Sequence, residues 1–141
     1  MKIKVKKLND LAKLPNFAHV GEDAGLDLYS VEKVVVAPME RVKIKTGIAL
    51  EIPRGYVGLV WDKGGPSFKY GLKTYGGVVD SGYRGELLIG IINLSNTEYV
   101  FNVGDKIAQL LIQKFEIVEI GEVDFLEGSM RDEGAFGSTG K

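Results

Sequence analysis

Residues 76–86 read Gly-Gly-Val-Val-Asp-Ser-Gly-Tyr-Arg-Gly-Glu, and an apolar run follows from Leu87 to Ile92. The glycine pair and Ser81-Gly82 are turn signals on either side of two β-branched residues, so the pattern predicts a β-hairpin with tight backbone at both ends. Such a hairpin fixes one carboxylate, Asp80, at the end of a strand beside main-chain N–H and C=O groups. That arrangement suits a pocket that reads a flat polar ligand through its backbone while one acid acts on it. Taken alone, the same spacing is also typical of a surface turn, because aspartate favours turns.

The rest of the chain also has the period of β-strands. Short β-branched and aromatic runs recur roughly every 8–12 residues with turn residues between them, and no long segment has a helical period. This pattern predicts an all-β sandwich or barrel over residues 1–125, followed by a flexible glycine-rich tail over residues 126–141. The irregular stretch 62–70 holds at most one helical turn, and Trp61 before it is expected to pack in the barrel wall. The predicted strands cover residues 2–6, 24–30, 34–36, 42–46, 48–52, 56–61, 78–79, 87–92, 99–101, 106–115 and 117–123.

The composition excludes several classes of protein. Eighteen basic and nineteen acidic side chains leave a net charge near −1, so there is no basic footprint for a nucleic-acid partner. The chain has no cysteine, which excludes disulfides and thiolate metal sites. No apolar run is long enough to span a bilayer, and none follows the basic start as in a signal peptide. A cytoplasmic protein without a membrane partner is therefore expected.

Two further stretches carry polar groups that suit a ligand. Residues 62–72 read Asp-Lys-Gly-Gly-Pro-Ser-Phe-Lys-Tyr-Gly-Leu, and the lysines and the Gly64-Gly65 pair between strands suit an anionic ligand. A solvated turn with ordinary surface lysines is the alternative. In the predicted strand at 106–115, Gln109 is a polar residue among apolar neighbours and needs a hydrogen-bond partner. A satisfied core amide is the alternative there.

The C-terminal tail combines groups that bind phosphate with one aromatic ring. Gly137, between two further glycines, and the Ser138-Thr139 hydroxyls form a backbone nest that suits phosphate oxygens. Arg131 adds a charge-assisted contact, and the Phe136 ring offers a face on which a base stacks, a contact worth about 1–3 kcal/mol. A disordered C-terminus is the alternative.

Together with Ala24-Gly25-Leu26-Asp27-Leu28, these stretches resemble the five ordered motifs of the trimeric dUTP diphosphatases (dUTPases). The resemblance runs from residue 24 to residue 140 and preserves the order and spacing of the motifs. It implies a jelly-roll β-barrel and a homotrimer with active sites between subunits, in which the swapped C-terminal tail closes over a neighbour's site. It also implies hydrolysis of dUTP to dUMP and pyrophosphate with Mg²⁺.

The resemblance assigns roles to residues in and around the 76–86 stretch. Asp80 would contact the deoxyribose 3′-OH and activate the water that attacks the α-phosphorus. Tyr83 would pack under the sugar and leave no room for a 2′-OH. Main-chain groups of the 74–79 segment would read the uracil, among them those of Thr74, Gly77 and Val79.

The remaining motifs would hold the triphosphate and its metal ion. Lys63 and Gln109 would face the phosphates, beside the backbone of Gly64 and Gly65. Asp27 would support the metal–water shell or the interface, while the substrate phosphates hold Mg²⁺ and no protein residue ligates it directly. In the tail, the residues expected to bind substrate are Arg131 on the γ-phosphate, Phe136 on the uracil, and Gly137, Ser138 and Thr139 on phosphate oxygens.

Departures from the family pattern leave alternatives open. Gly64 stands where the family has a serine that contacts the phosphate, and loss of one such donor costs about 10²–10³ in rate. A catalytically weakened, dUTPase-like nucleotide-binding protein is therefore one alternative. A dCTP deaminase-like enzyme is another, but it needs a carboxylate at the position of Gly90, and glycine cannot move a proton. A jelly roll without a nucleotide site is the remaining one. Lys106, where arginine is common in the family, is a milder departure.

Overall fold

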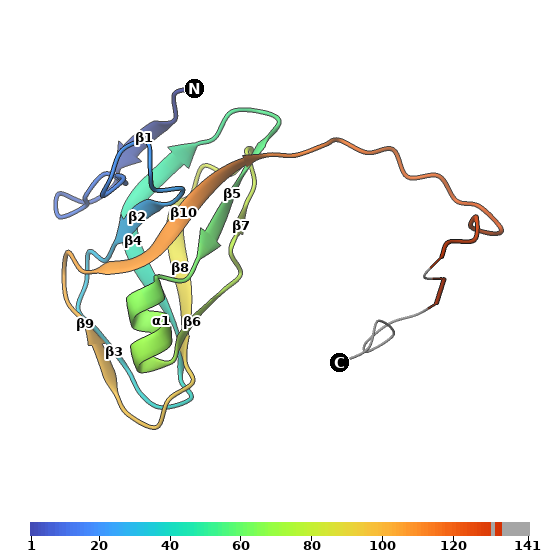
Figure 1. Cartoon of the computed structure of the whole chain (residues 1–141). Helices are drawn as coiled ribbons and strands as arrows, with labels where there is room; N and C mark the ends of the chain where they lie inside the picture. Colours follow the sequence, from blue (N-terminus) through green and yellow to red (C-terminus); the bar gives the residue numbers. More distant parts are fainter. Residues whose placement is uncertain (131, 134–141) are drawn as a thin grey trace.

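The computed structural model describes residues 1–130, 132 and 133, and this part of the chain is built mostly of antiparallel β-strands (Figure 1). Nearly every stretch with strand periodicity forms a strand, which confirms the all-β class. No helix in this part is long and apolar enough to cross a membrane. The elements are β1 (Lys4–Lys7), β2 (Leu26–Tyr29), β3 (Val34–Val36), β4 (Arg41–Glu51), β5 (Tyr56–Trp61), α1 (Gly64–Tyr70), β6 (Leu72–Tyr75), β7 (Val78–Val79), β8 (Glu86–Asn93), β9 (Tyr99–Phe101) and β10 (Lys106–Lys114).

Two four-stranded sheets form the predicted jelly-roll barrel, in the orders β1-β4-β8-β6 and β2-β10-β5-β7, and β3 pairs with β9 at one end (Figure 1). Side chains alternate between the two faces of each strand, so along β8 the buried Leu87 and Ile89 flank the exposed Leu88. The inward side chains of the sheets meet in one apolar core, which holds the strands in fixed register. Its largest members include Leu28, Ile44, Ile89, Phe101, Ile107 and Leu110.

The predicted hairpin at 76–86 is wrong. β7 pairs with β5, whereas β8 pairs with β4 and β6, so the two strands lie in different sheets and the turn between them crosses from one sheet to the other. The turn itself forms, with the Tyr83 N–H donating to the Asp80 carbonyl at 3.1 Å. β7 has two residues and β8 has eight, so β8 gains far more hydrogen bonds from the eleven-residue β4 than β7 could supply. Turn residues are encoded locally, but the choice of a strand partner is not.

The 62–70 stretch forms α1, a helix of seven residues and so about two turns, where at most one turn was predicted. Pro66 lies in its first turn, where the missing N–H costs nothing. Gly71 ends the helix in the left-handed region, at φ 65°, which favours glycine. Trp61, the last residue of β5, is 53% exposed, so the prediction that it packs in the barrel wall is wrong. Its neighbour Val60 packs against the core, and the alternation of the strand turns Trp61 outward.

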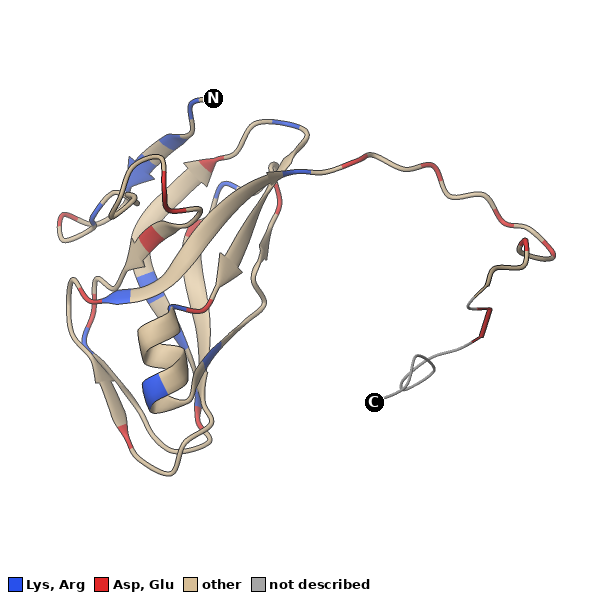
Figure 2. Ribbon diagram, in the orientation of Figure 1, with Lys and Arg blue, Asp and Glu red and all other residues tan. Residues whose placement is uncertain are grey.

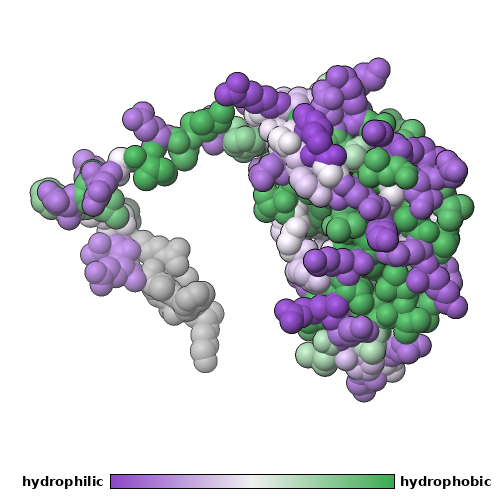
Figure 3. Space-filling view, turned by 180° about the vertical axis from the view of Figure 1, so that it is seen from behind, coloured by the Kyte–Doolittle hydropathy of each residue, from purple (hydrophilic) through white to green (hydrophobic). Residues whose placement is uncertain are grey.

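After β10 the chain leaves the barrel as an extended segment, residues 115–130, which we call the arm (Figure 1). The strand predicted at 117–123 does not form, because the arm pairs with none of the described strands of its own chain. Apolar side chains such as Ile117, Ile120 and Val123 are exposed along it (Figure 3). Its charged residues are all acidic, whereas charges of both signs are interspersed over the barrel (Figure 2). The apolar side chains of the arm therefore lack a cover within the described part of one chain.

Candidate functional site

Asp80 and Tyr83 lie on the turn between β7 and β8, beside a shallow pocket of about 230 Å³. The Tyr83 Oη donates to the Glu86 carbonyl at 3.0 Å, and the ring covers Gly85, where an added Cβ would lie 2.4 Å from the hydroxyl oxygen. The ring is therefore held in place. The Asp80 side chain, by contrast, is exposed and has no hydrogen-bond or ion-pair partner among the described residues. We call Asp80, Tyr83 and residues 76–79 the turn group; its pocket is lined by Gly76, Val78, Val79, Asp80, Tyr83, Glu86, Leu87 and Leu88.

Asp27 lies in β2 between two lysines and is 2% exposed. The Lys63 Nζ, at the start of α1, is 2.5 Å from Oδ1, and the Lys106 Nζ, at the start of β10, is 2.7 Å from Oδ2. Burial raises the pKa of Asp27, but the hydrogen bonds and charges of Lys106 and Lys63 outweigh it and hold the pKa below the ordinary aspartate value. Two cations share one buried anion, so a surplus positive charge remains, which suits an anionic ligand.

Gln109 lies next to these charges, because in β10 it pairs with Asp27 on one side and with Trp61 on the other. Its Nε2 donates to the Asp62 carbonyl at 2.8 Å. Its Oε1 lies against Gly25, where an added Cβ would be 2.4 Å away, so any larger residue there would displace the amide. The Gln109 side chain thus has the hydrogen-bond partner that its position in an apolar strand predicted. We call Asp27, Lys63, Lys106 and Gln109 the lysine group.

The 74–79 segment is attached to the end of β5. Thr74 donates its N–H and its hydroxyl to Oδ1 of Asp62, at 2.7 and 2.6 Å. The Gly77 carbonyl accepts the Val60 N–H at 2.8 Å, and a Cβ at Gly77 would lie 2.5 Å from the Val60 carbonyl oxygen. Glycine at this position is therefore required by close backbone approach. Both Thr74 donors are used within the chain, which leaves other main-chain groups of the segment for a ligand.

Asp80 of the turn group and Lys63 of the lysine group lie toward opposite ends of β5 within one chain. Val79 pairs with Gly58 near the start of β5, whereas Lys63 follows the end of the same strand. Lys63 is five positions after Gly58, and at the rise of an extended strand this is about 16 Å of backbone. A ligand that touches Asp80 must span most of this length to reach Lys63 of the same chain.

The remaining predicted site residues are the Gly64-Gly65 pair and the residues of the tail. Gly64 and Gly65 form the first turn of α1 beside Lys63, and nothing lies within 4 Å of a Cβ added at either position. No close approach therefore requires glycine there. The predicted tail residues Arg131, Phe136, Gly137, Ser138 and Thr139 lie outside the described residues.

The described residues do not form a cage for a metal ion. They contain no group of three His, Cys, Asp or Glu side chains placed to share an ion. Asp27 faces a lysine at each of its oxygens, which opposes direct ligation. Mg²⁺ is commonly held by substrate phosphates and water with few protein ligands, and the residues present are compatible with that mode.

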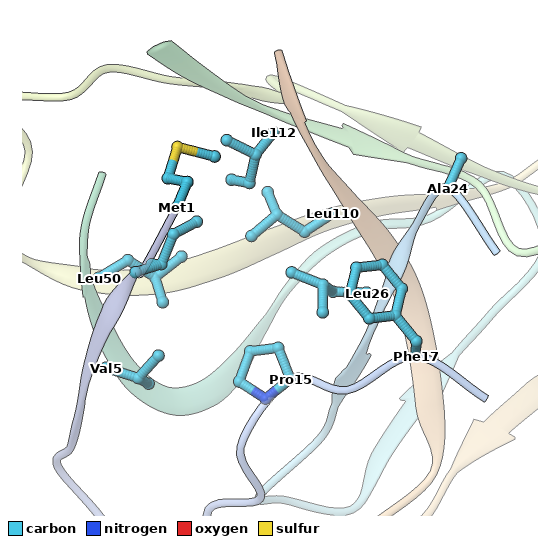
Figure 4. A pocket seen from close by; sticks show the side chains of 10 residues that line it. Met1, Val5, Pro15, Phe17, Ala24, Leu26, Leu50, Leu110 and Ile112 are labelled. Atoms are coloured by element: carbon cyan, nitrogen blue, oxygen red, sulfur yellow. The ribbon is translucent and has the colours of Figure 1, made fainter. Parts of the chain in front are cut away.

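An apolar pocket of about 380 Å³ lies apart from both groups, beside β1 and β10 (Figure 4). None of its lining side chains titrates, so it offers no acid–base chemistry. The side chains that line it are those of Met1, Ile3, Val5, Pro15, Phe17, Ala24, Leu26, Leu50, Leu110 and Ile112.

Sequence reasoning missed Asp62 as a member of the site. It follows a strand and precedes a glycine-containing turn, a position where aspartate is ordinary. Its partners at Thr74 and Gln109 lie 12 and 47 residues away in the chain, so no local signal indicates them.

The described residues thus form an all-β barrel with an open carboxylate on one turn and two lysines around a buried aspartate. The family model described as dUTPase matches residues 12–140 of this chain. The chain therefore belongs to the dUTPase family.

Relatives and solved structures agree with this assignment over nearly the whole chain. The chain is 44% identical over 142 residues to a deoxyuridine 5′-triphosphate nucleotidohydrolase of Clostridium kluyveri, covering 99% of each protein. It is 45% identical over 140 residues to the enzyme of that name from Clostridioides difficile, covering 98% of this chain and 97% of the relative. The Staphylococcus bacteriophage 80alpha dUTPase with dUPNHPP matches with a TM-score of 0.92 and 34% identity over 99% of both chains. A dUTPase from phage phi11 of S. aureus, described with a structural Mg(II) ion, matches with a TM-score of 0.84 and 33% identity over 91% of this chain and 100% of that one.

Proposed function

We propose that this protein hydrolyses dUTP to dUMP and pyrophosphate. The observation that carries the proposal is the exposed Asp80 carboxylate beside the fixed Tyr83 ring, in a chain that belongs to the dUTPase family. Full-length similarity to proteins named as deoxyuridine 5′-triphosphate nucleotidohydrolases supports the same reaction. The cytoplasmic location expected from the sequence stays a prediction.

In this proposal Asp80 acts as the base. Its carboxylate accepts a hydrogen bond from the 3′-OH and takes a proton from the water that attacks the α-phosphorus. The new P–O bond forms as the bond from the α-phosphorus to the bridging oxygen breaks, and pyrophosphate leaves. Tyr83 packs under the deoxyribose, and main-chain groups of the 74–79 segment read the uracil edge. The held ring and the glycine-tight backbone supply the rigidity that such recognition needs.

The lysine group receives the triphosphate in this proposal. Lys63 and Lys106 carry two positive charges against the one buried carboxylate of Asp27, so the pair attracts phosphate oxygens. Gln109 stands beside them, and the Gly64-Gly65 backbone lines the same loop. Mg²⁺, carried in by the phosphates, would neutralise charge on them, with Asp27 at most in its outer shell.

We further propose a homotrimer in which each site combines the turn group of one copy with the lysine group of another. The backbone separation of about 16 Å between Lys63 and the residue that pairs with Val79, next to Asp80, supports it. The exposed apolar arm supports association too, because its side chains need a cover that the described part of one chain does not provide. The tail over residues 126–141 would then close over a neighbouring copy's site.

A catalytically weakened nucleotide-binding protein is the second candidate, favoured by one observation. The position of a Cβ at Gly64 is open, and no side chain of the described residues lies within 4 Å of it to take the place of the serine that this position has in the family pattern. A dCTP deaminase-like reaction has no support, because a Cβ at Gly90 would lie 2.7 Å from the Tyr75 ring, so the required carboxylate has no room.

Incubation of the purified protein with Mg²⁺ and each deoxynucleoside triphosphate separates these functions. Pyrophosphate from dUTP, and far less from the other three, supports the proposal. Tight dUTP binding without products indicates the binding protein, and ammonia from dCTP indicates the deaminase.

A further inference from the structure

Asp62 joins three segments of the barrel through three kinds of contact. Its Oδ1 accepts the N–H and the hydroxyl of Thr74, and its Oδ2 lies 2.8 Å from the Lys73 Nζ. Its main-chain carbonyl accepts the Gln109 amide at 2.8 Å. One residue thus holds the end of β6 through its side chain and the middle of β10 through its backbone.

The side-chain contacts matter because β6 is an edge strand. It pairs with β8 alone, and Thr74 lies opposite Ile91 in that pairing. The Thr74 N–H donates to the Asp62 carboxylate, which belongs to the segment following β5 in the other sheet. The bond therefore ties the two sheets together where the 74–79 segment begins.

The carboxylate is ionised when it makes these bonds. Burial raises the pKa of Asp62, but the hydrogen bonds from Lys73 and Thr74 outweigh it and hold the pKa below the ordinary aspartate value. Hydrogen bonds to a charged acceptor are stronger than those between neutral groups. The hydrogen bond from the Thr74 N–H to Asp62 is therefore well suited to hold the backbone of the 74–79 segment in place.

We propose that Asp62 is a positioning residue that fixes the 74–79 segment for recognition of the base. The proposal rests on the proposed dUTP hydrolysis. Asp62 itself touches neither substrate nor reacting atoms, and it acts through Thr74. Because its side chain leaves the lysine group untouched, its loss weakens nucleoside binding equally in the ground state and the transition state. Such a loss raises KM and leaves kcat nearly unchanged.

The test compares Asp62→Ala, Asp62→Asn and Thr74→Val with the wild type. Asp62→Ala is expected to raise KM for dUTP about tenfold with kcat within about twofold, and to lower the preference for dUTP over dCTP. Asp62→Asn keeps an acceptor for Thr74, so KM stays within about threefold of wild type. Thr74→Val removes one donor and keeps the other, and about a threefold rise in KM is expected. Asp10→Ala, an exposed aspartate whose side chain has no partner among the described residues, is the matched control and leaves all values unchanged.

A second readout does not depend on catalysis. The Val60 N–H donates to the Gly77 carbonyl, so its hydrogen exchange reports whether the segment stays attached to β5. Faster exchange in Asp62→Ala supports the proposal even if the wild type does not cleave dUTP, and that result would count against the proposed function alone. Unchanged KM and exchange in Asp62→Ala, or a fall in kcat at constant KM, overturns the positioning role. If Asp62→Ala does not fold, an unchanged KM in Thr74→Val overturns it.

Discussion

Asp27 and Asp80 are both aspartates that the sequence placed in the site, and the fold treats them in opposite ways. Asp27 is buried and bound to two lysines, while Asp80 is exposed and has no partner among the described residues. A buried, paired carboxylate stabilises the fold and arranges its neighbours, whereas an open one contributes little stability and is available to a ligand. The lysine group and the turn group are therefore expected to respond differently to mutation.

The largest difference is expected from Asp80→Asn. The amide cannot take a proton from water, so kcat should fall about 10³-fold, while dUTP affinity stays within a few-fold. Because the side chain is exposed, the free energy of unfolding should change by no more than about 0.5 kcal/mol. Pyrophosphate release and thermal unfolding of the same preparations check both parts. An active Asp80→Asn enzyme would mean that another group is the base.

Asp27→Ala, unlike Asp80→Asn, should lower the stability of the fold substantially. It removes both ion pairs and leaves two lysines close together, so the free energy of unfolding should fall by about 2 kcal/mol. Urea unfolding measures this loss, with Asp10→Ala as the surface control that stays near wild type. A variant as stable as wild type would remove the structural role assigned to the lysine group.

Acid should lower the stability of the protein through two paired aspartates, Asp27 and Asp62. The folded-state pKa of Asp27 and of Asp62 lies below the ordinary value of 3.8, so the folded protein binds fewer protons than the unfolded chain in this range. Stability from these groups is then fully present above about pH 5 and is lost as the pH falls through 3.8 toward the folded pKa. Melting temperatures measured from pH 6 to pH 3 should fall less steeply for Asp27→Asn than for wild type. Equal slopes would show that Asp27 does not contribute.

The smallest change is expected at Gly64, beside the lysine group. The open space around its Cβ position accepts a serine without strain, so Gly64→Ser should leave the melting temperature nearly unchanged. If the missing hydroxyl limits the enzyme, kcat should rise at least about tenfold, toward the factor of about 10²–10³ that one such donor supplies. Steady-state kinetics with dUTP give the answer. An unchanged or lower kcat would show that this chain has rebuilt the phosphate contact.

The strands could be predicted well from the sequence, because the alternation of apolar and polar residues is a local property of each segment. The stretch Leu87–Ile92 and the stretch 106–115 both form strands at these positions. The sequence failed where the outcome depends on distant partners. The 76–86 stretch has the signals of a hairpin, yet β4 outcompetes β7 as the partner of β8. The arm has a strand pattern, but none of the strands in the described part of the chain pairs with it.

For the site residues, too, local patterns could be predicted and distant partners could not. Asp80 and Gln109 could be singled out from their immediate surroundings, and the family resemblance added Tyr83. The ion pair from Asp27 to Lys63 spans 36 residues, and it exists only because β10 lies between β2 and β5. Asp62 could not be found at all, since its partners are set by the same pairing. Local sequence predicts which residues carry chemistry, and the sheet order decides which of them meet.

The central claim is that Asp80 of one copy works with Lys63 of another, and mixed oligomers test it most directly. Asp80→Asn and Lys63→Met chains with different affinity tags are co-expressed, and hybrids are purified through both tags. Each homotrimer is expected to be nearly inactive. In a cyclic trimer with shared sites, every hybrid has one site with both residues intact, so about one third of the wild-type rate should return. Hybrids as inactive as their parents would contradict the claim and place the whole site within one chain.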